Sequence, residues 1–409
     1  MKKTLIALIF LSVQLSLTAR QTNTNWSYPA PSGAYQVGTV AWTLEDCSRT
    51  EKLTPDKQCR KFTVRAWYPA ASTTGRSKLG FLEGYDLEKT APFFGLHGAR
   101  QEELKARAQS VKTSAYKDAD ITKKKSLPVI IFSHGFGLSL SELHASFAIE
   151  AASQGYLVFG INHPYESMAT HLNDQIVYLD AAHNQRLTNS VFANASKLVA
   201  LPTLPDDLAR KELMKEVLGS MTEMNTRLEE WVKDQRFLID HLISADKDKS
   251  SKWHRKVDSK RIGTMGHSFG GTTAAQTLMD DAHVKSAVNL DGLQMGDLVN
   301  KNVDKPLMMV SSKIYQGLND SVFEGATGPI FLIHPGDKMT YHNVYTDMVL
   351  WPDSYFDNRR QAIGEVDGAT FVRMINKLLL TFFDHSLNKK EINLNRVLND
   401  YDQLKLIEN

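Results

Sequence analysis

The sequence predicts an α/β fold in which a mostly parallel central sheet carries helices on both faces. Short apolar segments with the length of buried strands alternate with helical patterns along the chain. The clearest case is strand 127–132, helix 140–153 and strand 156–160, because such a unit predicts a parallel pair of strands. A second case is the glycine-rich turn at 266–271, which joins an apolar strand to a helical segment.

The turn at 266–271 has the sequence Gly-His-Ser-Phe-Gly-Gly, a GxSxG motif between strand 261–265 and helix 272–279. Glycines on both sides let the strand and the helix approach closely and hold the residue at the apex in a strained conformation. The hydroxyl of Ser268 would then lie near the positive end of the following helix. We therefore predict that Ser268 is a nucleophile; the alternative is a glycine-rich turn with an incidental serine.

A serine nucleophile needs a histidine to take its proton and a carboxylate to orient that histidine. In this strand, turn and helix arrangement the three follow in the order Ser, Asp, His. Asp291 lies at the C-terminal edge of the short apolar strand 285–290 and is the predicted acid, although a surface aspartate that starts a turn would also fit. The competing carboxylates lie at a helix end, past the strand edge or in a turn, and they are Asp280, Asp281, Asp297 and Asp337.

Two histidines follow the apolar run 329–333 and are candidates for the base. His334 ends that run directly, whereas His342 comes after a loop that contains Gly336. A catalytic histidine must reach sideways to the serine, and a loop after the last strand permits this. We therefore predict His342 as the base, and for His334 a structural role at the strand end.

The oxyanion hole is expected to use two backbone N–H groups. The first is that of Phe269, directly after the nucleophile, and the second comes from a loop after an upstream strand. Residues 133–137, Ser-His-Gly-Phe-Gly, follow strand 127–132, and the glycines on either side of Phe136 let its backbone face a substrate. We predict Phe136 as the second donor. The spacing of Ser139 and Glu142 predicts a capping box for the next helix.

The composition is that of a soluble globular protein, with 409 residues, 42% hydrophobic and 23% charged. A net charge of +2 gives no reason to expect a nucleic acid partner. We expect residues 28–409 to form a single domain. Segment 164–205 is long and lacks a clear period, so it is a candidate lid or cleft wall inserted in that domain.

Other segments give weaker or longer-range patterns. Segments 35–43 and 61–68 are rich in β-branched and aromatic residues and predict an antiparallel pair. Apolar residues recur at helical spacing between 221 and 242 and predict a long helix. Segment 70–125 is irregular, and its aromatic residues would pack over a cleft or cover the core.

The N-terminal segment has two lysines, an apolar run at 4–17 and a polar exit, which is the pattern of a secretory signal peptide over 1–22. We expect export, to the periplasm or outside the cell, with an uncleaved anchor as the alternative. The only cysteines, Cys47 and Cys59, predict a disulfide that stabilises the fold by about 3 kcal/mol. The chain has no CxxC or HExxH motif, so we expect no metal and no cofactor.

Together the motifs resemble the platelet-activating factor acetylhydrolase family, that is the secreted lipoprotein-associated phospholipase type and its bacterial relatives. The resemblance rests on 132–137, on 266–271, on Asp291 with the following glycine, and on His342 with an aromatic residue three positions later and an acid five positions later. It extends from about Pro29 to the end of the chain.

This resemblance implies an α/β-hydrolase fold and calcium-independent hydrolysis of the sn-2 ester of phospholipids that carry short or oxidised acyl chains. It implies Ser268, Asp291 and His342 as the triad. The rivals are a general carboxylesterase or polyester hydrolase and a non-catalytic binding protein of the same fold. Peripheral contact with a lipid surface stays open, because the sequence shows no strongly amphipathic basic helix.

The substrate pocket is the least defined part of the expected site. His134, Leu293 and Tyr345 are its candidate residues, since they lie in or beside the motifs named above. Leu293 stands where the secreted animal enzymes have a tryptophan, and 162–170 is only loosely similar to the family. Both departures bear on the preference for acyl chain and head group.

Overall fold

The computed structural model describes residues 26–137, 139–173, 175–323, 326–336 and 340–407 of the chain. The predicted signal peptide at 1–22 and the competing carboxylate Asp337 lie outside the described residues. Within the described ranges, none of the helices combines the length and the apolar character that crossing a membrane would need.

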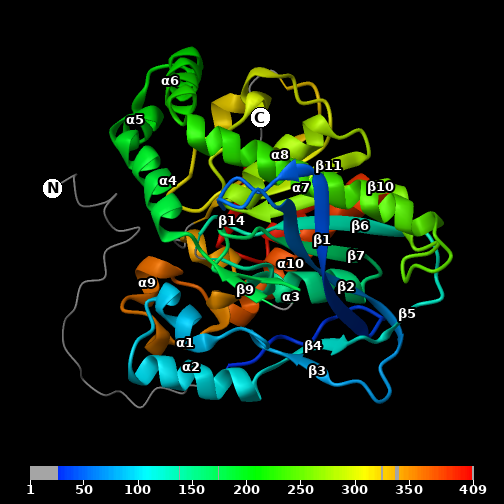
Figure 1. Cartoon of the computed structure of the whole chain (residues 1–409). Coiled ribbons are helices and arrows are strands. Elements are labelled where there is room, and N and C mark those ends of the chain that lie inside the picture. Colours follow the sequence, from blue (N-terminus) through cyan, green and yellow to red (C-terminus); the bar gives the residue numbers. More distant parts are fainter. Residues whose placement is uncertain (1–25, 138, 174, 324–325, 337–339, 408–409) are drawn as a thin grey trace.

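A large mixed sheet forms the centre of the protein (Figure 1). Its strands run in the order β14-β13-β12-β11-β10-β6-β7-β2-β1-β4-β3, with β5 paired to β2, and β8 pairs with β9 in a separate hairpin. The strands are β1 (Val37–Thr50), β2 (Cys59–Ser72), β3 (Lys78–Gly80), β4 (Lys112–Lys117), β5 (Asp120–Ile121), β6 (Leu127–Ser133), β7 (Leu157–Asn162), β8 (Ala169–Leu172), β9 (Gln175–Tyr178), β10 (Val257–His267), β11 (Val284–Leu290), β12 (Leu307–Val310), β13 (Ile330–Pro335) and β14 (Leu404–Ile407).

The middle of the sheet is parallel, as the sequence predicts. From β13 through β12, β11, β10 and β6 to β7, each strand pairs in parallel with the next. β2 then pairs antiparallel with both β7 and β1, which confirms the predicted antiparallel pair. β14, which the sequence pattern did not predict, closes the opposite edge antiparallel to β13.

Helices cover both faces of the parallel strands, which confirms the predicted layers. Figure 1 shows α7 and α8 on one side of the sheet and α3 and α10 on the other. The helices are α1 (Leu87–Thr90), α2 (Ala99–Ser110), α3 (Ala145–Ser153), α4 (Ala181–Ala193), α5 (Ala195–Ala200), α6 (Asp207–Ser220), α7 (Thr222–Lys247), α8 (Phe269–Asp280), α9 (Arg359–Ala362), α10 (Gly368–Asn388) and α11 (Leu394–Leu398).

Both faces of β6 are buried, because its side chains alternate between two hydrophobic cores. Ile130 and Phe132 pack in the core beneath α3 and α10, whereas Val129 and Ile131 pack in the core beneath α7 and α8. Alternation with a period of two residues places successive side chains on opposite faces of a sheet. A strand buried on both faces therefore has the continuous apolar sequence seen at 127–132.

The predicted capping box before α3 is wrong. The Ser139 hydroxyl is buried without a hydrogen-bond partner, and the chain first forms a short 3₁₀ turn, η3 (Ser141–His144), before α3 begins. Glu142 instead accepts from Arg65 Nε at 2.9 Å and from Asn162 Nδ2 at 2.9 Å. A charged donor on a neighbouring strand holds this carboxylate more strongly than the backbone amide that a capping box offers.

Segments 70–125 and 164–205 contain local structure that their sequence patterns did not predict. Segment 164–205 contains the hairpin β8-β9 and the helices α4 and α5. The helices α4, α5 and α6 form one group at an edge of the molecule (Figure 1). In segment 70–125, Phe81 packs edge-on against Trp26 and Trp351, with ring centroids 5.0 and 5.9 Å apart. The sequence left open whether the aromatic residues of this segment pack over a cleft or cover the core. Phe81 covers the core.

The predicted disulfide is present. Cys47 and Cys59 are bonded, with an S–S distance of 2.13 Å. The bond joins the distal end of β1 to the start of β2, so it ties the two strands of the opening antiparallel pair where their pairing becomes irregular.

Candidate active site

Ser268 occupies the turn between β10 and α8 in a strained backbone conformation, with φ 55° and ψ −124°. A non-glycine residue at positive φ is uncommon and is kept only where the surrounding structure enforces it. The turn can close this tightly because Gly266 has no side chain. A Cβ on Gly266 would lie 2.2 Å from the backbone carbon of Gly270. Ser268 remains partly exposed, so a small molecule can reach it.

Asp291 lies beside the turn because its strand is the neighbour of β10. The N–H of Ser268 donates to Leu290 O at 2.7 Å, and the N–H of Asp291 donates to Val310 O at 2.7 Å. Three adjacent parallel strands thus place their carboxyl ends together. Asp291 is 1% exposed, and its Oδ1 accepts the backbone N–H of Ser312.

His342 completes the arrangement from the loop after β13. Its Nδ1 and Oδ2 of Asp291 are 2.7 Å apart, and its side chain is 28% exposed. With the Nδ1 proton donated to the carboxylate, Nε2 is left as the basic nitrogen. His334, in contrast, bonds through Nε2 to Asp320 Oδ1 at 3.0 Å. The geometry therefore favours His342 over His334 as the candidate base.

A second histidine holds the backbone of the candidate base. His267 Nε2 donates to His342 O at 3.1 Å, and the two rings lie 4.3 Å apart. Burial, together with the nearby His342, keeps the pKa of His267 well below its usual value. His267 is therefore a neutral donor that fixes the start of the loop.

Tyr345 and Asp347 lie in the short 3₁₀ turns η7 (His342–Tyr345) and η8 (Asp347–Leu350). The side chains of both residues hold the same loop in place. The Tyr345 hydroxyl donates to Ser311 O at 3.0 Å, next to the residue whose N–H binds Asp291. Asp347 accepts from the N–H of Ser146 at 3.2 Å and from its hydroxyl, at the start of α3.

Asp347 should make the stability of the fold depend on pH. Burial raises its pKa to about 7, against the hydrogen bonds from Ser146 that lower it. An unfolded aspartate has a pKa of about 3.9, so the folded state binds this proton more tightly and stability falls as pH rises from about 4 to 7. Relative to wild type, Asp347→Asn should gain up to about 4 kcal/mol of unfolding free energy between pH 4 and pH 8.

Urea unfolding at each pH measures this effect. Asp304→Asn, at an exposed carboxylate, is the control and should follow wild type across the range. If Asp347→Asn and wild type gave parallel curves between pH 4 and pH 8, Asp347 would not titrate in that window.

The two residues that carry the candidate oxyanion donors lie close together. Phe269 is the first residue of α8, where backbone N–H groups have no partner within the helix. Its ring is 5.8 Å from that of Phe136. A Cβ on Gly135 would lie 3.2 Å from Ser268 Cβ, so the loop that carries Phe136 packs directly against the turn.

Segment 164–205 packs on the other side of this loop. The N–H of Gly137 donates to Glu166 O at 2.8 Å. From α4, the ring of His183 lies 6.1 Å from that of Phe136, and Oδ1 of Asn184 lies 2.7 Å from where a Cβ on Gly137 would be.

The expected pocket residues His134, Leu293 and Tyr345 are buried in this structure. His134 is 0% exposed, and backbone groups occupy both of its ring nitrogens. Tyr345 is 6% exposed and uses its hydroxyl on Ser311, as described above. Leu293 is 9% exposed and packs in the core beneath α7 and α8. Hydrogen bonds and apolar packing thus fix the positions of these side chains.

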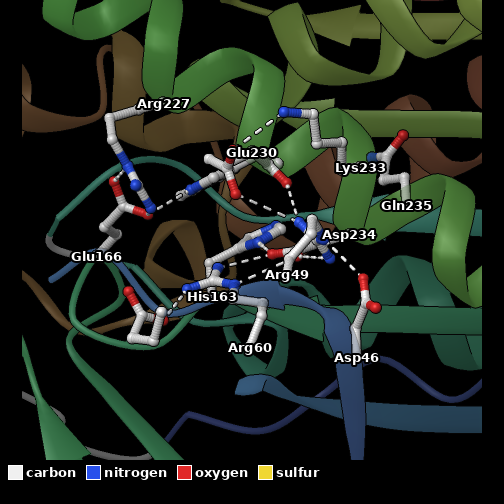
Figure 2. Close-up of polar contacts among 12 residues, drawn as sticks. Asp46, Arg49, Arg60, His163, Glu166, Arg227, Glu230, Lys233, Asp234 and Gln235 are labelled. Atoms are coloured by element: carbon white, nitrogen blue, oxygen red, sulfur yellow. Dashed lines mark hydrogen bonds and ion pairs between the residues drawn. The ribbon is translucent and has the colours of Figure 1, made fainter. Parts of the chain in front are cut away.

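A buried ionic network, which was not predicted from the sequence, lies beside the loop 134–137. Figure 2 shows its charged members, which come from β1, β2, the loop after β7, and α7. They include Arg49, Arg60, Glu166, Arg227 and Asp234. One indication was available, because Arg227 and Asp234 interrupt the apolar stripe of α7 at helical spacing from Trp231.

Comparisons with known proteins show which family this chain matches. A sequence model of the family described as "Platelet-activating factor acetylhydrolase, isoform II" matches residues 20–406. A platelet-activating factor acetylhydrolase of Cavia porcellus is 24% identical over 294 residues, which span 69% of this chain and 63% of that relative. The chain thus matches less than two thirds of that relative's length. A probable 1-alkyl-2-acetylglycerophosphocholine esterase of Arthroderma benhamiae is 21% identical over 404 residues, which span 90% of each chain.

Among solved structures, the chain is similar to a ferulic acid esterase from Streptomyces cinnamoneus. The TM-score is 0.71 at 19% sequence identity, and the match covers 94% of this chain and 99% of the other. At this identity the likeness concerns the fold. Together with the strand order described above, it confirms the expected α/β-hydrolase fold.

Proposed function

The chain belongs to the family described as platelet-activating factor acetylhydrolase, isoform II, and we propose that it hydrolyses the sn-2 ester of phospholipids with short or oxidised acyl chains. Family membership supports an ester hydrolase. The observation that carries the serine mechanism is the 2.7 Å contact between His342 Nδ1 and Asp291 Oδ2, at the sheet edge where Ser268 occupies its strained turn.

In this proposal, Ser268 Oγ attacks the ester carbonyl carbon while His342 Nε2 takes its proton. The carbonyl oxygen becomes an oxyanion, and the backbone N–H groups of Phe269 and Phe136 hold it. Each such donor is worth about 3 kcal/mol in the transition state. Asp291 stabilises the imidazolium that forms on His342.

The tetrahedral intermediate then collapses. The bond to the glycerol oxygen breaks, and His342 gives its proton to that oxygen, so the lysophospholipid leaves and the acyl group stays on Ser268. A water molecule, deprotonated by His342, attacks the acyl carbonyl. The ester to Ser268 breaks, the short acid is released, and Ser268 recovers its proton. Apart from the substrate and this water molecule, these steps use side chains and backbone groups of this chain.

We further propose that 28–409 is one domain and that segment 164–205 forms a wall of the cleft. The sheet supports the first point, since N-terminal β1 and C-terminal β14 belong to it. The contacts of Glu166 and Asn184 with Gly137 support the second. The Cys47–Cys59 disulfide supports an oxidising compartment, and we propose export directed by segment 1–22.

The substrate test compares phospholipids that differ only in the sn-2 chain. In EDTA, wild type should release acetate from a 2-acetyl phospholipid with a kcat/KM about 100-fold or more above that for the palmitoyl counterpart. A p-nitrophenyl ester and a polyester film are run in parallel. Activity on these two alone would keep an esterase but contradict the phospholipid substrate.

A further inference from the structure

We propose that His134 holds the peptide between Gly135 and Phe136 so that the N–H of Phe136 is fixed as an oxyanion donor. His163 and Asp234 hold His134 in turn. We call these three residues the peptide lock. The inference rests on the proposed serine esterase function, and it makes His134 a positioning residue of that reaction.

The first step concerns one peptide bond. His134 Nδ1 donates to Gly135 O at 2.7 Å. That carbonyl and the N–H of Phe136 belong to the same peptide, and the described residues contain no cis peptide bond. In a planar trans peptide the C=O and N–H point in opposite directions. Fixing the carbonyl of Gly135 therefore fixes the direction of the N–H of Phe136.

This peptide needs such a restraint because glycine precedes it. A glycine has few steric limits on its ψ, so the peptide that follows it rotates easily. The neighbouring peptide is held separately, by the hydrogen bond from the N–H of Gly137 to Glu166 O at 2.8 Å. The hydrogen bond from His134 Nδ1 to Gly135 O restrains the preceding peptide, between Gly135 and Phe136, in the same way.

The second step concerns the protonation of His134. Its Nε2 lies 3.1 Å from the backbone N of His163 and accepts that N–H, so the single ring proton must be on Nδ1. His134 is 0% exposed, and burial, with His163 beside it, lowers its pKa to about 3. The ring thus stays neutral and keeps its donor directed at Gly135 O.

The third step concerns the side chain of His163. Its Nδ1 lies 2.8 Å from Asp234 Oδ2, and its Nε2 lies 3.1 Å from Ser133 Oγ. This is the atom order of a Ser-His-Asp triad, but all three residues are 0% exposed. The indole of Trp231 stacks on His163 with centroids 3.7 Å apart. No substrate reaches Ser133, so the arrangement orients His163 and does not catalyse.

The last step connects the lock to the rest of the fold. Asp234 accepts from Arg60 Nη2 at 2.7 Å and from Arg49 Nη2 at 2.8 Å, and Figure 2 shows these side chains converging with His163 on Asp234. Burial alone would raise the pKa of Asp234, but Arg60 and His163 more than offset this and keep it well below its usual range. The carboxylate therefore stays charged and holds the proton of His163 Nδ1 in place.

The test compares two substitutions at position 134, each of which introduces a side-chain amide. The nitrogen of asparagine falls near that of Nδ1, whereas the amide of glutamine falls near Nε2. His134→Asn therefore keeps a donor to Gly135 O, and His134→Gln loses it. We expect His134→Gln to lower kcat by about 10²-fold to 10³-fold, as removal of one oxyanion donor does, with KM within about threefold. His134→Asn should keep kcat within about tenfold of wild type.

A trifluoromethyl ketone gives a readout that a purely structural role would not change. Its hemiketal oxyanion binds where the reaction's oxyanion binds, so its Ki should rise in His134→Gln in proportion to the loss in kcat/KM. The control is His254, whose Nδ1 donates to Asp246 O at 3.1 Å, near the start of β10 and away from Ser268. His254→Asn and His254→Gln should share the wild-type kcat.

Each outcome decides the inference. Equal kcat values for the two position-134 amides, in an active enzyme, would contradict the lock and leave the esterase standing. Equal activity of wild type and Ser268→Ala would remove the proposed function, and the lock would fall with it. If the position-134 variants do not fold, Ser133→Ala takes their place. It should lower kcat about tenfold at unchanged KM, and an unchanged kcat would contradict the peptide lock.

Discussion

Ser268→Ala is expected to lower kcat for ester hydrolysis by about 10⁵-fold or more, because it removes the only atom that forms the acyl-enzyme. The residual rate would come from the oxyanion donors and from substrate binding. Steady-state release of acetate from a 2-acetyl phospholipid measures the effect. The fold should be kept, since alanine fits the space that serine occupies.

A serine elsewhere provides the matched control for this substitution. Ser386 on α10 is partly exposed like Ser268, and its hydroxyl donates to Ser286 Oγ at 2.8 Å. Ser386→Ala should leave kcat unchanged. Near wild-type hydrolysis by Ser268→Ala would mean that the strained turn has another role.

His342→Ala should reduce kcat by about 10⁴-fold or more, because the serine then has no base and the leaving alcohol has no acid. His334→Ala, on the strand β13 that precedes this loop, provides the comparison. His334→Ala removes the bond to Asp320, so this substitution should lower stability by about 1 kcal/mol and leave kcat near wild type.

The two histidine variants together decide the base. Measuring kcat with an activated p-nitrophenyl ester as well as a phospholipid separates the two functions of the histidine, since a good leaving group needs little protonation. The loss of kcat in His342→Ala should be smaller with the activated ester than with the phospholipid. A larger loss in His334→Ala than in His342→Ala would reverse the assignment.

The turn around Ser268 could be predicted from the sequence because its causes are local. Glycines at fixed spacing and a short apolar run before them specify a strand, a tight turn and a helix. The parallel strands were predictable for a related reason: burial on both faces gives β6 its continuous apolar sequence. Asp291 and His342 followed from their places after strands.

The structure around the loop 134–137 could not be predicted, because its partners are distant in sequence. Asp234 meets Arg60 across 174 positions, and no local pattern encodes that contact. The motif alone does not show that backbone groups occupy both ring nitrogens of His134. The capping box at Ser139 failed in the same way, since Arg65 on β2 holds Glu142.

Helices α4 and α5 were missed for another reason. The sequence of segment 164–205 has no clear apolar period, although α4 has 13 residues and α5 has 6. Only two residues of α4, His183 and Leu187, are buried, and none is buried in α5. A helix that buries so little apolar surface leaves no periodic pattern to detect.

Covalent labelling of Ser268 tests the central claim most directly. An organophosphonate that mimics the tetrahedral intermediate is incubated with the protein, and the intact mass and the modified peptide are then measured. The account predicts one adduct per chain, located on Ser268, formed in step with the loss of hydrolysis and absent in Ser268→Ala. An adduct on another residue, or full hydrolysis by the labelled protein, would contradict a serine esterase built on this turn.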